Sequence, residues 1–119
     1  MAKPHESLEV WKCSMDLVEQ IYRLTAGFPP SEQYGLTSQM RRAAVSIPSN
    51  VAEGAGRFGS REFARFLSMA RGSLSELDTQ HQIALRLGYV RSDTAEVDAL
   101  MDRVGKLLSG LLKKMKESE

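Results

Sequence analysis

The sequence predicts an all-α protein, an antiparallel up-down-up-down four-helix bundle in which the second helix is kinked or broken near Pro48. Apolar residues recur at intervals of three and four along four segments, as they do on one face of a helix. Stretches rich in glycine and proline separate the segments, and no segment alternates like a half-buried strand. Connections this short between long helices favour antiparallel neighbours.

The first predicted helix covers about residues 8–26 and ends where Gly27 precedes two prolines. Its apolar positions are Trp11, Met15, Val18, Ile21 and Tyr22. The second predicted helix begins at Ser31 or Gln33 and ends at Ala55. Its apolar positions are Leu36, Met40, Ala43, Ile47, Val51 and Gly54. Because proline lacks an amide hydrogen and clashes with the preceding turn, Pro48 should kink or break this helix.

The third predicted helix has Ser60 as its N-cap and ends at Leu87, where Gly88 suits a left-handed C-cap. It carries a heptad-like seam of Phe63, Leu67, Ala70, Leu74, Leu77, His81 and Ala84. The fourth predicted helix starts near Ser92 or Asp93, and lysines in its last turns favour the negative helix end. Its apolar positions are Val97, Leu100, Met101, Val104, Leu107, Leu108, Leu111 and Met115.

The length and composition predict one ordinary globular domain over residues 1–119. Hydrophobic residues make up 42% and charged residues 26%, which excludes a disordered chain. The single cysteine, Cys13, and an N-terminus without an apolar signal segment indicate the cytoplasm. No window approaches the roughly 18 apolar residues of a membrane helix, so we expect no membrane association.

No sequence motif of a catalytic or metal site stands out. A di-metal bundle places Glu-x-x-His pairs on facing helices, whereas here Glu76 and His81 lie five residues apart. His81 falls in the apolar seam, so we expect a partly buried, hydrogen-bonded histidine. The glycines between Gly54 and Gly59 follow no strand, and we interpret them as a turn. We therefore expect no enzymatic activity, no metal, no cofactor and no small-molecule substrate.

The positive charge is concentrated in the middle of the chain. The formal net charge is only +1, but residues 41–71 hold six arginines and two glutamates. Guanidinium groups bind phosphates and carboxylates in a bidentate manner. At 100° per residue, Arg42, Arg61 and Arg65 point away from the predicted core. The candidate nucleic-acid-binding residues are Arg42, Arg57, Arg61 and Arg65, with Arg41 and Arg71 on the flanks.

Two interpretations of these arginines remain open. They could form a basic ridge that contacts the phosphates of a nucleic acid, with Phe58 the one nearby aromatic residue suited to stack on a base. They could instead form ordinary ion pairs on a solvated face with Glu53 and Glu62. Arg41 or Arg42 could also form a buried or intersubunit pair with Glu53 or Glu76.

A series of motifs runs in order through about 80 residues of the chain. They are Leu8-x-Val10-Trp11, Tyr34-Gly35-Leu36-Thr37, Gln39-x-Arg41-Arg42-Ala43, Ser46-Ile47-Pro48-x-Asn50, Ala52-Glu53-Gly54, Ala70-x-Gly72-Ser73-x-x-Glu76 and Leu87-Gly88-Tyr89. In these motifs the chain resembles the bacterial four-helix bundle family encoded in intervening sequences of 23S ribosomal RNA genes. The accessory variability proteins of diversity-generating retroelements are related to that family.

The resemblance implies a four-helix protomer that assembles into a homopentameric ring or barrel. It also implies association with nucleic acid, since the retroelement relatives bind RNA and a reverse transcriptase. The structural motif residues are Trp11, Asn50, Glu53, Gly54, Gly72, Ser73 and Glu76. The small ones should allow close helix approach, and the polar ones should lie beside those contacts.

The sequence therefore favours a non-enzymatic, oligomeric nucleic-acid-binding bundle whose arginine ridge contacts the phosphates of RNA. The alternative is a protein-interaction scaffold, in which the ring binds an acidic protein partner such as a reverse transcriptase.

Overall fold

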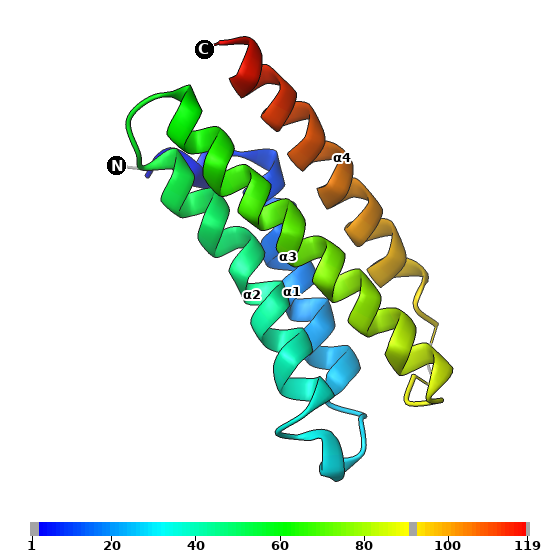
Figure 1. Ribbon diagram of the computed structural model, residues 1–119. Helices are drawn as coiled ribbons and strands as arrows, with labels where there is room; N and C mark the ends of the chain where they lie inside the picture. Colours follow the sequence, from blue (N-terminus) through cyan, green and yellow to red (C-terminus); the bar gives the residue numbers. More distant parts are fainter. Residues whose placement is uncertain (1–2, 91–92, 119) are drawn as a thin grey trace.

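Four long helices make up the computed structural model, which describes residues 3–90 and 93–118 (Figure 1). They are α1 (Glu9–Thr25), α2 (Leu36–Ala55), α3 (Ser60–Arg86) and α4 (Ala95–Glu117), with short 3₁₀ helices η1 (Pro4–Ser7) and η2 (Pro30–Glu32). Each long helix packs against two neighbours, in the cyclic order α1, α2, α3, α4, and the bundle measures 45 × 26 × 21 Å. The described residues contain no strand, and the predicted four-helix bundle is confirmed.

The core consists of one apolar stripe from each helix. On α3 the predicted seam is buried from Leu67 to Ala84, and only Phe63 at its start is half-buried. All six predicted apolar positions of α2 are buried as well. His81 is completely buried within this seam, and its Nε2 lies 3.1 Å from Oδ1 of Asp98 on α4. The predicted hydrogen bond of the histidine is confirmed, and its side chain is buried more deeply than predicted.

The predicted core face of α1 is largely wrong. The buried stripe is Val10, Cys13, Leu17 and Ile21. Of the predicted residues only Ile21 belongs to it, while Trp11, Met15, Val18 and Tyr22 are half-buried or exposed. Both sets follow intervals of three and four, so the spacing alone could not decide which stripe faces the bundle. As a result, a second apolar strip of α1 lies near the surface.

Pro48 does not break α2, which continues as one helix from Leu36 to Ala55. Its ring is buried and lies beside Trp11 and Met15 of α1. Polar side chains bond to backbone carbonyls around it: Ser49 Oγ donates to Val45 and Asn50 Nδ2 to Ser46, each at 2.8 Å. Packing against α1 thus accompanies the loss of one backbone hydrogen bond.

The predicted start of α2, at Ser31 or Gln33, is too early, because α2 begins at Leu36. A side-chain carboxylate before the helix caps its first backbone amide. Glu32 Oε1 accepts the backbone N–H of Leu36 at 3.1 Å, and Oε2 accepts the Tyr89 hydroxyl at 2.8 Å. A Cβ at Gly35 would lie 2.6 Å from Glu32 Oε1, so a larger residue here would displace this carboxylate from its present position. These bonds lower the pKa of Glu32, chiefly through the Leu36 amide, so the stability they contribute is lost as the pH falls through that pKa.

A glycine with positive φ lies at each end of α3. The N-cap is Gly59, with φ of +84°, so Ser60 is the first helical residue and not the predicted cap. At the C-terminus Gly88 has φ of +75°, and the Tyr89 N–H reaches the Ala84 carbonyl at 3.0 Å. The predicted left-handed cap is therefore confirmed.

The fourth helix begins at Ala95, two or three residues later than predicted. Asp93 lies before it and its Oδ1 accepts the Ala95 N–H at 2.9 Å. The other predicted start, Ser92, lies outside the described residues.

The prediction that small residues allow close helix approach is confirmed at Gly54 and is wrong at Gly72. A Cβ at Gly54 would lie 2.7 Å from Phe66 Cβ and 3.0 Å from Phe63 Cδ1, so α2 and α3 touch through this glycine. A Cβ at Gly72 would meet nothing within 4 Å, because this residue lies on the outer surface of α3.

We expect Gly54→Ala to destabilise the fold and Gly72→Ala to stabilise it. The first inserts a methyl group into a filled contact, with a cost of about 1–3 kcal/mol. The second removes a helix-interior glycine in open space, with a gain of about 0.5–1 kcal/mol. Urea unfolding followed by circular dichroism measures both, and equal stabilities of the two variants would contradict the close contact at Gly54.

Candidate nucleic-acid interface

A basic groove runs between α3 and α4 at the end of the bundle that holds the α2–α3 turn. Its cationic residues are Arg61, Arg65 and Arg71 on α3 and Lys113 and Lys116 on α4. Its floor contains Ala64 and Leu112, and one acidic residue, Glu117, also lines it. Figure 1 shows why the two sets meet: the antiparallel course brings the end of α4 beside the start of α3. We call this set of five cationic side chains the basic groove.

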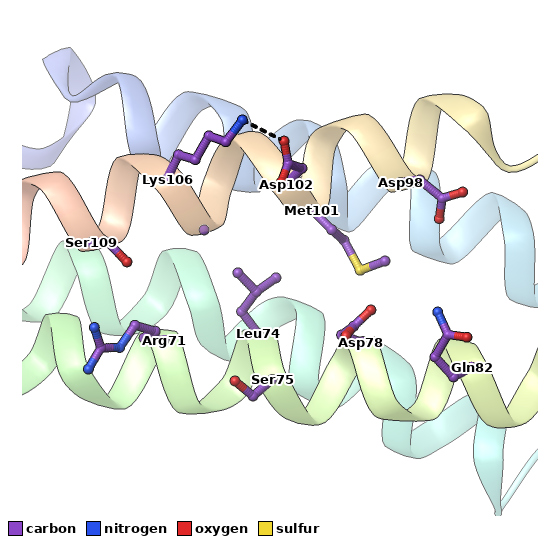
Figure 2. Close-up of a pocket in the computed structure, with 11 residues that line it drawn as sticks. Arg71, Leu74, Ser75, Asp78, Gln82, Asp98, Met101, Asp102, Lys106 and Ser109 are labelled. Atoms are coloured by element: carbon purple, nitrogen blue, oxygen red, sulfur yellow. Dashed lines mark ion pairs between the residues drawn. The ribbon is translucent and has the colours of Figure 1, made fainter.

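The charge of the α3–α4 groove changes sign along its length. Beyond Arg71 it opens into a depression of about 770 Å³ lined by Asp78, Asp98 and Asp102 (Figure 2). Lys106 lies here too, but its Nζ is 3.0 Å from Asp102 Oδ2. A polyanion would thus be attracted to one half of the groove and repelled by the other.

Arg57 and Arg65 both lie close to one buried aromatic ring. Their guanidinium carbons are 5.1 and 4.6 Å from the ring centroid of Phe66. Arg57 pairs with Glu53 at 2.9 Å and Arg65 with Glu62 at 3.1 Å. The alternative of ordinary ion pairs is therefore realised for these two arginines.

These ion pairs do not remove Arg57 and Arg65 from possible ligands, because about half of each side chain is exposed. Exposed pairs of this kind contribute only about 0–1 kcal/mol, so a phosphate can compete with the carboxylate. The Arg65 hydrogen bond lowers the pKa of Glu62, and the charges of Arg57 and Arg61 act in the same direction. This end of the bundle is thus a region of positive potential.

Arg61, Arg71, Lys113 and Lys116 are exposed and make no ion pair with any of the described residues. They are therefore the least compensated charges in the basic groove. Arg61 precedes Arg65 by one helical turn, so the two share a face as the sequence predicted.

Arg41 caps the C-terminus of α1. Its Nε donates to Thr25 Oγ1 at 2.9 Å and its Nη2 to the Tyr22 carbonyl at 3.2 Å, while the guanidinium lies 4.5 Å from the Tyr22 ring centroid. A cation at this position also complements the helix dipole. Within one chain Arg41 pairs with neither Glu53 nor Glu76 in the described residues, and it lies at the end of α1 and not beside Arg57, Arg61 and Arg65.

Arg42 is exposed but lies far from the basic groove. It precedes Gly54, which touches Phe66, by twelve residues, or about 18 Å along a helix. It pairs with neither Glu53 nor Glu76 in the described part of the chain. The structure therefore does not bring Arg42 together with Arg57, Arg61 and Arg65.

The other motif residues hold local structure or lie on the surface. Trp11 is half-buried, with its ring centroid 5.0 Å from that of His5, and Asn50 bonds within α2 as described above. Ser73 Oγ donates to the Met69 carbonyl of its own helix at 3.2 Å. Glu76 is exposed, so it does not lie beside a close helix contact as expected.

Sequence reasoning missed Lys113 and Lys116 as part of this site. Both were explained by the helix dipole of α4, which is a sufficient reason for lysines in a last turn. The signal that could have placed them is the predicted topology itself. In an antiparallel hairpin the end of the fourth helix must lie beside the start of the third.

Other kinds of site are not formed within residues 3–90 and 93–118. No group of three or more His, Cys, Asp or Glu side chains is arranged to hold a metal ion there. Over the same residues, no helix has the length and apolar character required to cross a bilayer.

Comparison with known proteins gives a family and a fold. The family model described as 23S rRNA-intervening sequence protein matches residues 6–110. A crystal structure of a protein of unknown function from the S23 ribosomal protein family of Bacteroides thetaiotaomicron is similar, with a TM-score of 0.76. It is 19% identical, over 87% of this chain and 98% of that one, so this likeness shows the fold alone. Among curated proteins no match is found.

Proposed function

The chain belongs to the 23S rRNA-intervening sequence protein family, and we propose that it is an oligomeric, non-enzymatic protein that binds RNA in the basic groove. The observation that carries the proposal is the gathering of five cationic side chains from α3 and α4 along one groove. Four of them make no ion pair with any described residue.

Phosphate is the ligand group that this groove suits best. Its cations extend from Arg61 to Arg71 on α3 and from Lys113 to Lys116 on α4, so a backbone of repeated negative charges can meet several of them. Three are arginines, which form bidentate bonds to phosphate oxygens. Contacts of this kind position a nucleic acid without reading its sequence. The family description refers to 23S rRNA, which favours RNA over DNA.

Self-association is the second part of the proposal, and the exposed apolar strip of α1 supports it. Met15, Val18 and Trp11 line a shallow apolar groove with Val45 and Pro48 of α2. Met15 and Val45 are each about 40% exposed, and Tyr22 continues the strip along α1. An apolar surface of this kind indicates a protein contact, and a second copy of the chain is the partner that the expected ring supplies.

A protein scaffold is the second candidate function. The floor of the basic groove is apolar at Ala64 and Leu112, and Met69 lies at its edge, 46% exposed. An acidic amphipathic segment could use this floor and the cationic rims together. A reverse transcriptase as that partner, and the relation to retroelement accessory proteins, stay predictions, as does the cytoplasmic location.

We expect charge reversal in the basic groove to weaken RNA binding and to flatten its salt dependence. Arg61→Glu or Lys116→Glu should each reduce the slope of log K against log salt by about one, because one phosphate contact is lost. Lys114→Glu is the matched control, since Lys114 lies on the same helix but lines a different groove beside Leu8 and Glu9. Fluorescence anisotropy with a labelled RNA at several salt concentrations measures these slopes.

Two outcomes would contradict nucleic-acid binding by this groove. One is the absence of salt-dependent RNA binding by the wild-type protein, which would favour the scaffold. The other is a loss of slope in Lys114→Glu equal to that in Arg61→Glu, which would show general charge attraction and no defined groove.

We expect Met15→Glu to dissociate the oligomer into a species near 13.2 kDa. A carboxylate buried in an apolar interface loses its hydration without gaining a partner. Ile83→Glu is the control, because Ile83 is also exposed, at 43%, but lies on α3 away from this strip. Light scattering coupled to size exclusion gives the masses. A wild-type monomer, or an unchanged mass in Met15→Glu, would contradict an interface at this strip.

A further inference from the structure

Phe58 is the most exposed large apolar residue described in this chain. It lies in the turn between α2 and α3 and is 100% exposed, whereas Phe66, eight residues later, is buried. No aromatic contact or side-chain hydrogen bond involves it within the described residues. Because the side chain is completely exposed, the ring of Phe58 is open to a ligand.

Phe58 lies at the same end of the bundle as the basic groove (Figure 1). Arg57 precedes it directly, and Arg61 follows within the first turn of α3. Figure 1 shows this turn at the same end of the bundle as the C-terminal turns of α4, which carry Lys113 and Lys116. The α3 N-terminus lies here too and has no side-chain cap, so its first amides add to the positive potential.

An open aromatic ring in a turn that is flanked by Arg57 and Arg61 suits a nucleic acid with an unstacked base. A base can stack on a phenylalanine only if one of its faces is free, and the bases inside a duplex have none. The cations would hold the neighbouring phosphates at the same time. The acidic half of the α3–α4 groove, with Asp78, Asp98 and Asp102, would keep the bound segment short.

We propose that the basic groove, together with the α2–α3 turn at the same end of the bundle, selects single-stranded over double-stranded RNA, with one base stacked on Phe58 and the adjacent phosphates on Arg57, Arg61 and Lys116. This inference rests on the proposed RNA binding and adds the form of RNA that is bound. The surface contacts bases only through a ring face, so it accepts any base at this position.

The test uses one fluorescently labelled RNA oligonucleotide of about ten nucleotides, alone and as a blunt-ended duplex with its complement. The wild-type protein should bind the single strand more tightly. Phe58→Ala should weaken single-strand binding about tenfold and leave duplex binding and the salt slope unchanged, because no phosphate contact is lost. Phe58→Trp should restore the affinity, since it restores a stacking surface.

The outcomes separate this inference from the proposed function. If wild-type protein binds neither RNA, the proposed function fails. If Arg61→Glu weakens binding while Phe58→Ala binds the single strand like wild type, the groove binds RNA and the stacking inference is overturned. A change in oligomeric mass in Phe58→Ala would also overturn it, by showing that Phe58 packs against a second copy. Circular dichroism of Phe58→Ala should match wild type.

Discussion

Burial of one apolar stripe along α3 is the constraint on which the rest of the structure depends. Leu67, Leu77 and His81 are completely buried between the neighbouring helices, and this fixes the rotation of α3 about its axis. Because each residue turns the helix by about 100°, Arg61 then points away from the core and Arg71 lies on the flank of the buried stripe, and both line the groove with α4. The position of the cationic groups is thus a consequence of the core and requires no contact among the arginines.

The antiparallel topology decides which residues of α4 lie at this end of the bundle. It places lysines from the last turns of α4 beside arginines about fifty residues earlier in the chain. The close contact of Gly54 with Phe66 holds α2 against α3, so that Arg57 in the following turn reaches the ring that Arg65 also covers. The opposite end of the same groove is acidic. A chain with a net charge of only +1 therefore has a groove with more cationic residues at one end and more acidic residues at the other.

Much of the fold could be predicted from the sequence because the seams of α2 and α3 are regular and glycine ends α3. The errors have physical causes. The prediction of the buried face of α1 was wrong because two apolar stripes of this helix repeat at intervals of three and four. The buried stripe contains Val10, Cys13 and Leu17, and the predicted one contains Trp11, Met15 and Val18. The start of α2 was wrong because Glu32 caps it from outside the helix.

The candidate site was predictable only in part. Exposure of Arg61 and Arg65 followed from helical periodicity, which is a local property. The capping of α1 by Arg41 and the distance of Arg42 from the groove depend on how helices are placed against one another, and spacing along one helix does not contain that information.

The most direct measurement of where RNA binds is ultraviolet cross-linking of the wild-type protein to a uridine-rich single strand, followed by mass spectrometry of the linked peptides. We expect the linked residues to lie within 57–71 and 109–117, on the two sides of the basic groove. Cross-links concentrated on the outer face of α1, or at the acidic end around Asp78 and Asp98, would contradict RNA binding in this groove.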